Sequence, residues 1–109
     1  MLTVKVEEQG ASRVVRLSGE CDIASAPQLQ EALKSMRGPD ITEVIVDATE
    51  LDFMDSTGLG VVMGALKRLK ESGGTLKIAG ARGPVRRVLE VTGLDRVIPL
   101  FEDIEGATA

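Results

Sequence analysis

The stretch EVIVDATELDFMDSTGLGVVMGALKRL, residues 43–69, holds the two patterns that decide the fold of this 109-residue chain. Its β-branched run Val44–Val46 is unbroken, which is typical of a strand buried on both faces of a sheet. After Leu59, apolar residues return with the spacing of one helix face, at Val62, Met63, Leu66 and Leu69. The stretch therefore predicts a buried strand at 43–48 and a helix that begins near Ser56 and ends at the GG pair that follows.

The segment before this stretch predicts a hairpin and a helix. Residues 3–8 and 13–18 alternate between polar and apolar side chains and are separated by a short GAS turn, a pattern that favours two paired strands. Residues 25–36, SAPQLQEALKSM, have the apolar spacing of an amphipathic helix, and Ser25 with Gln28 is predicted to form a capping box at its start.

The segment after this stretch continues the alternation of strands and helices. TLKIAG, residues 75–80, predicts a strand, and GPVRRVLEVTG, residues 83–93, predicts a helix with proline at its start and glycine at its end. RVIPL, residues 96–100, predicts a last short strand, and the tail at 101–109 predicts a further helical turn.

The order of these elements predicts the fold class. Strands that alternate with helices after an initial hairpin indicate an α/β fold. We expect a mixed β-sheet of about five strands, an N-terminal hairpin followed by parallel crossovers, with about three to four helices packed on it. The length is that of one domain, so residues 1–109 are expected to form a single domain.

Charge and composition limit the classes of partner. Thirteen basic and seventeen acidic side chains give a net charge of −4, which argues against binding to the phosphate backbone of a nucleic acid. The apolar runs are far shorter than the roughly twenty residues that span a bilayer, and Met1 is not followed by a signal peptide. We expect a soluble, cytoplasmic protein with no direct nucleic-acid partner and no membrane insertion.

The residue types that are missing exclude several chemistries. The chain has no histidine, and Cys21 is its only cysteine. Ser-His-Asp and Cys-His catalysis, imidazole zinc sites and cysteine metal cages are therefore excluded. We expect no catalytic residue, no metal site and no cofactor, and we expect Cys21 to be a small buried hydrophobic residue.

The segment DSTGLG, Asp55 to Gly60, allows an enzymatic interpretation that the neighbouring residues contradict. One Asp-Ser-Gly or Asp-Thr-Gly per chain would suit a dimeric aspartic protease. Here Ser56 and Thr57 both separate Asp55 from Gly58, and the helix-rich pattern conflicts with the nearly all-β fold of those proteases.

The glycines of the same segment suggest a nucleotide site only weakly. Gly58, Gly60 and Gly64 resemble a dinucleotide fingerprint, but the strict motif requires glycine where Met63 stands, and no acid lies about twenty residues further on. Close packing of the helix on the sheet explains these small residues better. On spacing alone, Ser56 is most simply the N-cap of this helix, a role that Asp55 fills equally well.

Three longer stretches of the sequence add a resemblance to these patterns. They are VIVDATELDFMDSTGLGVVMGALKRLKESGGTLKIAG, the following PVRRVLEVTGLDRVIPLF and the upstream LSGECDIASAPQLQEAL. Together they resemble the bacterial anti-sigma factor antagonists of the STAS domain family over nearly the whole chain. The most specific part is D-S-[ST]-G-[LI]-G at Asp55–Gly60, and the resemblance implies a STAS-like fold formed by one STAS domain.

The resemblance also implies a phosphorylation switch without catalysis. In that family the first hydroxyl after the aspartate, here Ser56, is phosphorylated by a partner anti-sigma factor that is also a serine kinase. The unmodified protein binds this kinase and releases a sigma factor, and a separate phosphatase removes the phosphate. The implied partner-binding residues are Asp22, Asp55, Ser56, Thr57, Gly58 and Leu59.

Elementary electrostatics agrees with this role for Ser56. A phosphate at a helix N-terminus meets unpaired N–H groups and the positive end of the helix dipole, so the fold should tolerate it. Near Asp55, the added negative charge would make a docking face acidic enough to repel a complementary partner. Asp22 corresponds to the acid of the family's G-E-x-D segment, and we expect it on the same rim as Ser56.

Two departures from the family and two other functions stay open. Thr57 replaces a serine that is common in the family, and Cys21 replaces an aliphatic residue. A STAS scaffold subunit of a stress-signalling or transport complex would use the same face without phosphorylation.

A small hydrolase or nucleotide-binding enzyme is disfavoured by the missing histidine and phosphate loop. The cluster Arg82, Arg86 and Arg87 is interpreted as a solvated face.

Overall fold

The computed structural model describes residues 1–108 and contains one five-stranded sheet in the order β1-β2-β3-β4-β5. The strands are β1 (Leu2–Gln9), β2 (Ser12–Cys21), β3 (Glu43–Met54), β4 (Thr75–Ala79) and β5 (Leu100–Phe101). β1 and β2 form an antiparallel hairpin, and each later neighbour is parallel. The predicted mixed sheet is confirmed, while Ala109, the last residue of the predicted domain, lies outside the described residues.

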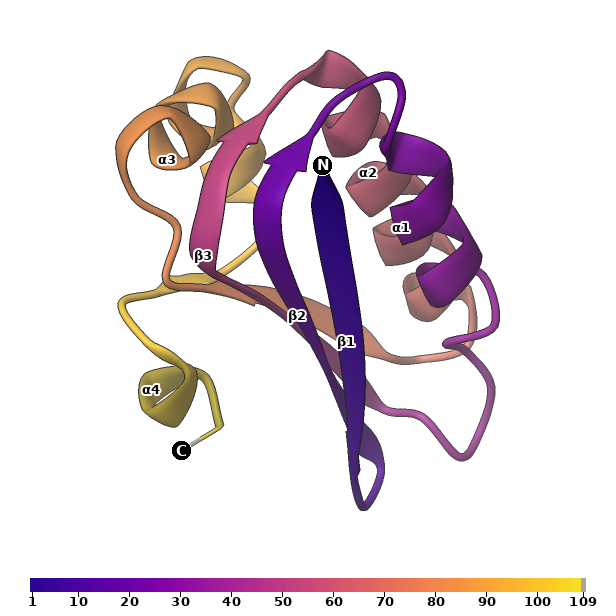
Figure 1. Cartoon of the computed structure of the whole chain (residues 1–109). Coiled ribbons are helices and arrows are strands. Elements are labelled where there is room, and N and C mark those ends of the chain that lie inside the picture. Colours follow the sequence, from indigo (N-terminus) through magenta and orange to yellow (C-terminus); the bar gives the residue numbers. More distant parts are fainter. Residues whose placement is uncertain (109) are drawn as a thin grey trace.

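In the described part of the chain, residues 1–108, four α-helices and one 3₁₀ turn connect and cover the strands. They are α1 (Ala26–Leu33), α2 (Ser56–Glu71), α3 (Gly83–Val91), η1 (Leu94–Arg96) and α4 (Ile104–Thr108). Figure 1 shows α1 and α2 side by side on one face of the sheet, with α4 on the other side. The main core lies under α1, α2 and α3, and a smaller cluster around Val14, Ile45 and Ala107 lies under α4.

The central strand and its helix follow the sequence pattern closely. Val44, Ile45 and Val46 are at most 1% exposed, which confirms a strand buried on both faces. The buried apolar side chains of α2 are Leu59, Val62, Ala65, Leu66 and Leu69. Met63 was predicted on this buried face, but it lies at the edge of the face and is 37% exposed. The helix ends as predicted near Gly73, whose φ of +84° is left-handed.

The capping box predicted at the start of α1 is wrong. Ser25 is the N-cap residue but makes no side-chain bond to the helix. Its hydroxyl lies 3.0 Å from two acceptors, the Glu20 carbonyl and Asp22 Oδ1, and its N–H donates to Asp22 Oδ1 at 3.0 Å. The Gln28 amide donates to the carbonyl of Leu2 in β1 at 3.0 Å. Ser25 therefore stabilises the loop before α1, and Gln28 makes a tertiary contact with β1 that the local sequence does not reveal.

The strand predicted at 96–100 is also misplaced. Gly93, with φ of +79°, turns the chain into η1, and the Leu94 carbonyl accepts the N–H groups of Val97 and Ile98. These two N–H groups are then unavailable to a sheet. Pairing with β4 resumes at Pro99, whose carbonyl accepts the N–H of Ile78, so β5 is confined to Leu100–Phe101.

Candidate functional site

The segment DSTGLG occupies the junction between β3 and α2. The backbone of Asp55 is extended, with φ of −100° and ψ of −174°, and its Oδ1 accepts the N–H groups of Thr57 at 3.0 Å and Gly58 at 3.1 Å. Asp55 is therefore the N-cap of α2. The prediction of Ser56 as the cap is corrected: Ser56 is the first helical residue, and its side chain is exposed.

Asp22 lies beside this junction because β2 and β3 end together. Cys21 is paired with Met54, and the Asp55 N–H donates to the Cys21 carbonyl at 3.1 Å. The residues that follow each strand, Asp22 and Asp55, are thus neighbours at one edge of the sheet. The expectation that Asp22 and Ser56 share a rim agrees with this geometry.

Asp22 is held in one orientation by the loop that it begins. Its Oδ1 accepts the N–H of Ala24 at 3.1 Å and both the N–H and the hydroxyl of Ser25 at 3.0 Å. These bonds, the Ser25 hydroxyl foremost, lower the pKa of the Asp22 carboxyl. Because the pKa is lower in the folded chain than in the unfolded chain, the Asp22 carboxylate stabilises the fold at pH values above its ordinary pKa. This stabilisation is lost as the pH falls through the lowered pKa. The rim is therefore acidic at neutral pH.

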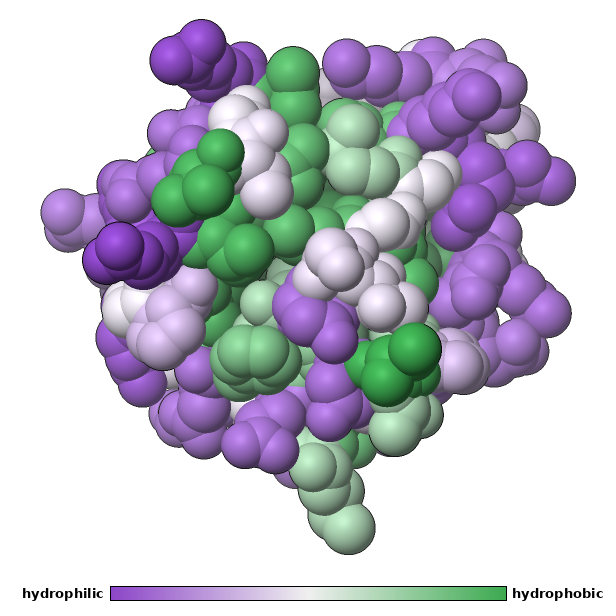
Figure 2. Space-filling view, turned by 90° about the horizontal axis from the view of Figure 1, so that it is seen from above, coloured by the Kyte–Doolittle hydropathy of each residue, from purple (hydrophilic) through white to green (hydrophobic). Residues whose placement is uncertain are grey.

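Two exposed apolar side chains stand next to these acids in the chain, and the sequence analysis missed both. Ile23 is 75% exposed and follows Asp22, and Phe53 is 42% exposed and lies two residues before Asp55. Figure 2 views this end of the molecule and shows apolar surface gathered near its centre with polar groups around it. We call Asp22, Ile23, Phe53, Asp55, Ser56 and Thr57 the carboxyl rim. Exposed apolar residues of this kind often mark interaction surfaces.

Gly58 and Leu59 support the rim from beneath. A Cβ atom at Gly58 would lie 2.8 Å from Cys21 Sγ and 3.0 Å from Met54 Cγ, so the first turn of α2 sits directly on the strand ends. Leu59 is 5% exposed and belongs to the core. Of the predicted partner-binding residues, these two position the helix, whereas Ser56 and Thr57 face solvent.

Cys21 is fully buried under the same turn, as predicted for a small hydrophobic residue. Burial, followed by the nearby charges of Asp55 and Asp22, raises the pKa of the thiol to about 11. The thiol is therefore protonated at neutral pH and is a poor nucleophile.

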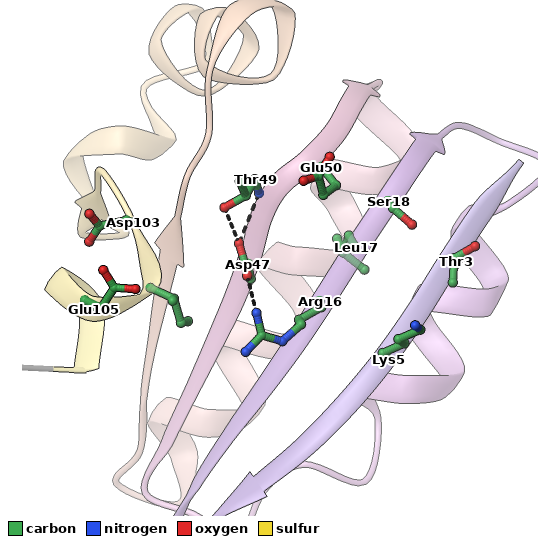
Figure 3. Close-up of a pocket in the computed structure, with 11 residues that line it drawn as sticks. Thr3, Lys5, Arg16, Leu17, Ser18, Asp47, Thr49, Glu50, Asp103 and Glu105 are labelled. Atoms are coloured by element: carbon green, nitrogen blue, oxygen red, sulfur yellow. Dashed lines mark hydrogen bonds and ion pairs between the residues drawn. The ribbon is translucent and has the colours of Figure 1, made fainter.

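A separate cavity of about 410 Å³ lies on the other face of the sheet (Figure 3). At its floor, Asp47 is only 6% exposed and accepts from Arg16 at 3.0 Å and from the Thr49 hydroxyl at 2.6 Å. Arg16 is also bonded to Glu7 at 2.7 Å. These charges satisfy one another, and none of the predicted site residues lines the cavity.

The basic cluster singled out in the sequence does not form a second site. Arg82, Arg86 and Arg87 are exposed, and Arg86 pairs with Glu90 at 3.4 Å, as expected of a solvated face. Within residues 1–108, no three acidic or cysteine side chains converge as metal ligands would. In the same residues, every helix is too short or too polar to cross a bilayer.

The sequence and the fold match known proteins. The STAS domain family matches residues 3–107 of the chain. An anti-sigma-B factor antagonist of Staphylococcus aureus is 33% identical over 104 residues, which cover 95% of this chain and 96% of that protein. The crystal structure of an anti-sigma factor antagonist from Mycobacterium paratuberculosis superposes with a TM-score of 0.88 at 30% identity, covering 99% of this chain and 92% of the other.

Two solved structures of SpoIIAA are also similar to this chain. The anti-sigma factor antagonist SpoIIAA in its unphosphorylated form has a TM-score of 0.84 at 26% identity, covering 97% of this chain and 93% of that protein. The phosphorylated form of the Bacillus protein has a TM-score of 0.76 at 24% identity, covering 97% and 96%. The chain belongs to the STAS domain family, and the relatives named here are anti-sigma factor antagonists.

The capping geometry gives a first testable prediction. Asp55→Ala removes two hydrogen bonds from the first turn of α2 and should lower the free energy of unfolding by about 1 kcal/mol. Ser56→Ala, which removes no cap, should change it by less than about 0.5 kcal/mol. Urea unfolding of both variants measures the difference, and a larger loss for Ser56→Ala would contradict the assignment of the cap to Asp55.

Proposed function

We propose that this protein is an anti-sigma factor antagonist controlled by phosphorylation at Ser56. In its unphosphorylated form it binds an anti-sigma factor that is also a serine kinase, and this binding releases a sigma factor. The observation that carries the proposal is an exposed serine at the first position of α2, directly after the carboxylate that caps the helix. The relatives' names point the same way.

The carboxyl rim has the composition of a docking surface. Ile23 and Phe53 offer apolar area that a partner can bury, and Asp22 and Asp55 offer acceptors for basic side chains. The Ser56 hydroxyl is small and neutral, so a partner can pack against it at little cost. A partner for this surface would combine an apolar depression with basic groups, and we place the anti-sigma kinase in this role.

A phosphate on Ser56 would change the surface more than the fold. Asp55 already occupies the N–H groups of Thr57 and Gly58, so the phosphate would not find an empty helix terminus. It would instead add roughly −1.5 to −2 charges beside Asp55 and Asp22. The Ser56 side chain is already exposed, so the core is undisturbed, and the effect falls on the partner through repulsion and desolvation.

Other parts of the proposal follow from this switch. Ser56 is preferred to Thr57 as the acceptor because the β-branched threonine side chain is stiffer at χ1. A phosphoprotein phosphatase would reset the switch. The protein itself would be a binding module without catalytic activity, acting in the cytoplasm as a single STAS domain.

The test is a binding experiment with paired baits. Wild type and Ser56→Asp are immobilised, exposed to lysate of the source bacterium, and the retained proteins are identified by mass spectrometry and then titrated in purified form. We expect an anti-sigma kinase to bind wild type at least about 100-fold more tightly than Ser56→Asp, because a negative charge opposes it at the interface.

Two controls isolate the position of the charge. Ser35→Asp carries the same charge at an exposed site after α1, away from the carboxyl rim, and should bind like wild type. Ser56→Ala should bind the kinase but accept no phosphate when incubated with it and ATP. Equal retention of the same proteins by wild type and Ser56→Asp would instead support a STAS scaffold whose Ser56 is never switched.

A further inference from the structure

β1 presents an open edge of the sheet. It is the first strand in the order β1-β2-β3-β4-β5, and within residues 1–108 it pairs only with β2. Figure 1 shows it at the margin of the sheet with α1 beside its N-terminal half. All residues from Lys5 to Gln9 are exposed, and Val6 has 45% of its surface in solvent. Such an edge is a template for pairing with another strand.

Two hydrogen bonds identify which backbone groups face outward. The Met1 carbonyl accepts the N–H of Glu20, so Met1 and the odd-numbered residues of β1 direct their backbone groups toward β2. The Leu2 carbonyl accepts the Gln28 side chain instead, on the other side. Along an antiparallel strand, the backbone N–H and C=O groups of successive residues point to opposite sides of the strand. Val4, Val6 and Glu8 therefore direct these groups to the open edge.

The charges along β1 select one way in which two copies can pair. When two β1 strands pair antiparallel, a two-fold axis relates them, and the residue on the axis faces its own copy. An axis at Lys5 places lysine opposite lysine, and an axis at Glu7 places glutamate opposite glutamate, and both pairs are unfavourable. An axis at Val4 needs the Leu2 carbonyl, which Gln28 already occupies. An axis at Val6 places Lys5 of each copy opposite Glu7 of the other.

We propose that two copies of this chain associate through β1 in antiparallel register centred on Val6. The outward groups of Val6 then pair with those of Val6 in the second copy, and the two exposed valine side chains meet. Lys5 of one copy joins the existing chain of charges on the other, in which Glu7 is bonded to Arg16 at 2.7 Å and Arg16 to Asp47 at 3.0 Å. The two sheets become one continuous sheet.

This arrangement is independent of the proposed function and compatible with it. Paired strands run in opposite directions, so the carboxyl rims of the two copies point to opposite ends of the joined sheet and remain free. A contact built on one strand pair buries less than the roughly 1,000 Å² of a stable interface, so we expect dissociation constants in the range of about 10 to 100 µM.

Sedimentation equilibrium from about 5 to about 500 µM protein tests the proposal, because this range spans the expected dissociation constant. Wild type should shift from the monomer mass toward twice that mass. Val6→Pro removes only an outward N–H, which an edge strand tolerates, and Lys5→Glu places like charges opposite each other. Both variants should stay monomeric with unchanged circular dichroism, while Lys70→Glu, a matched charge change on α2, should dimerise like wild type.

A charge-complementation arm examines the register. Lys5→Glu and Glu7→Lys should each fail to self-associate, yet their equimolar mixture should dimerise because every opposed pair is then of opposite sign. A wild type that is monomeric over the whole range, a dimer that survives Val6→Pro and Lys5→Glu, or a mixture that stays monomeric would overturn the proposal.

Discussion

Leu66→Asp is expected to leave the protein largely unfolded at room temperature. Leu66 is 5% exposed and is one of the buried apolar side chains of α2 within the main core. Its replacement removes about 2–5 kcal/mol of packing and adds the cost of a carboxylate with no partner there. A domain of this size has a total stability of about 5–15 kcal/mol, so one such change consumes most of it.

A matched variant on the same helix separates burial from helix propensity. Met63→Asp makes a similar change three residues earlier, at a position that is 37% exposed. It also stands four residues before Lys67, a spacing that favours opposite charges. We expect a loss below about 1 kcal/mol for this variant. Circular dichroism and urea unfolding measure both, and a cooperative, wild-type transition for Leu66→Asp would refute the helix register.

Gly80→Ala is expected to destabilise the fold by about 3–5 kcal/mol, through strain and overlap together. Gly80 follows β4 and has a left-handed φ of +76°. A Cβ atom at this position would overlap Thr49 Oγ1 and approach Thr49 Cα to 2.9 Å. The Thr49 hydroxyl is itself bonded to the buried Asp47 at 2.6 Å, so β3 cannot yield without disturbing that pair.

Gly93→Ala is the control for Gly80→Ala. Gly93 has nearly the same φ, +79°, but a Cβ atom there meets no other group within 4 Å. Only the strain of the left-handed conformation remains, worth about 1–2 kcal/mol. Urea unfolding of both variants gives the two losses. If they were equal, the close approach of Gly80 to β3 would have no energetic weight.

Local patterns were sufficient for most of the fold. The β-branched run at Val44–Val46 and the helical stripe from Leu59 to Leu69 are set by residues adjacent in the chain, and both occur where predicted. The extension of β3 to Met54 was not predicted. It depends on pairing with an irregular part of β2, where the register shifts between Arg16 and Ser18 and again after Gly19. A single sequence does not reveal such a pairing.

The candidate site divides in the same way. The motif located Ser56 and Asp55, but which of them caps α2 depends on the backbone angles. Asp55 is extended and is the N-cap of α2, whereas Ser56 is the first residue of the helix. Both residue types cap helices well, so composition alone could not decide between them. The exposure of Ile23 and Phe53 is a tertiary property, and apolar letters in a sequence are more often interpreted as core.

The burial of Cys21 beneath the first turn of α2 makes the alkylation rate of this thiol a measure of how often the structure around it opens. It is the only thiol in the chain, fully covered, with a pKa of about 11. An alkylating reagent at neutral pH reaches it when the turn that carries Ser56 lifts from the strand ends or when the whole chain unfolds. A labelling rate faster than the rate of global unfolding would therefore report local opening of the structure around Cys21.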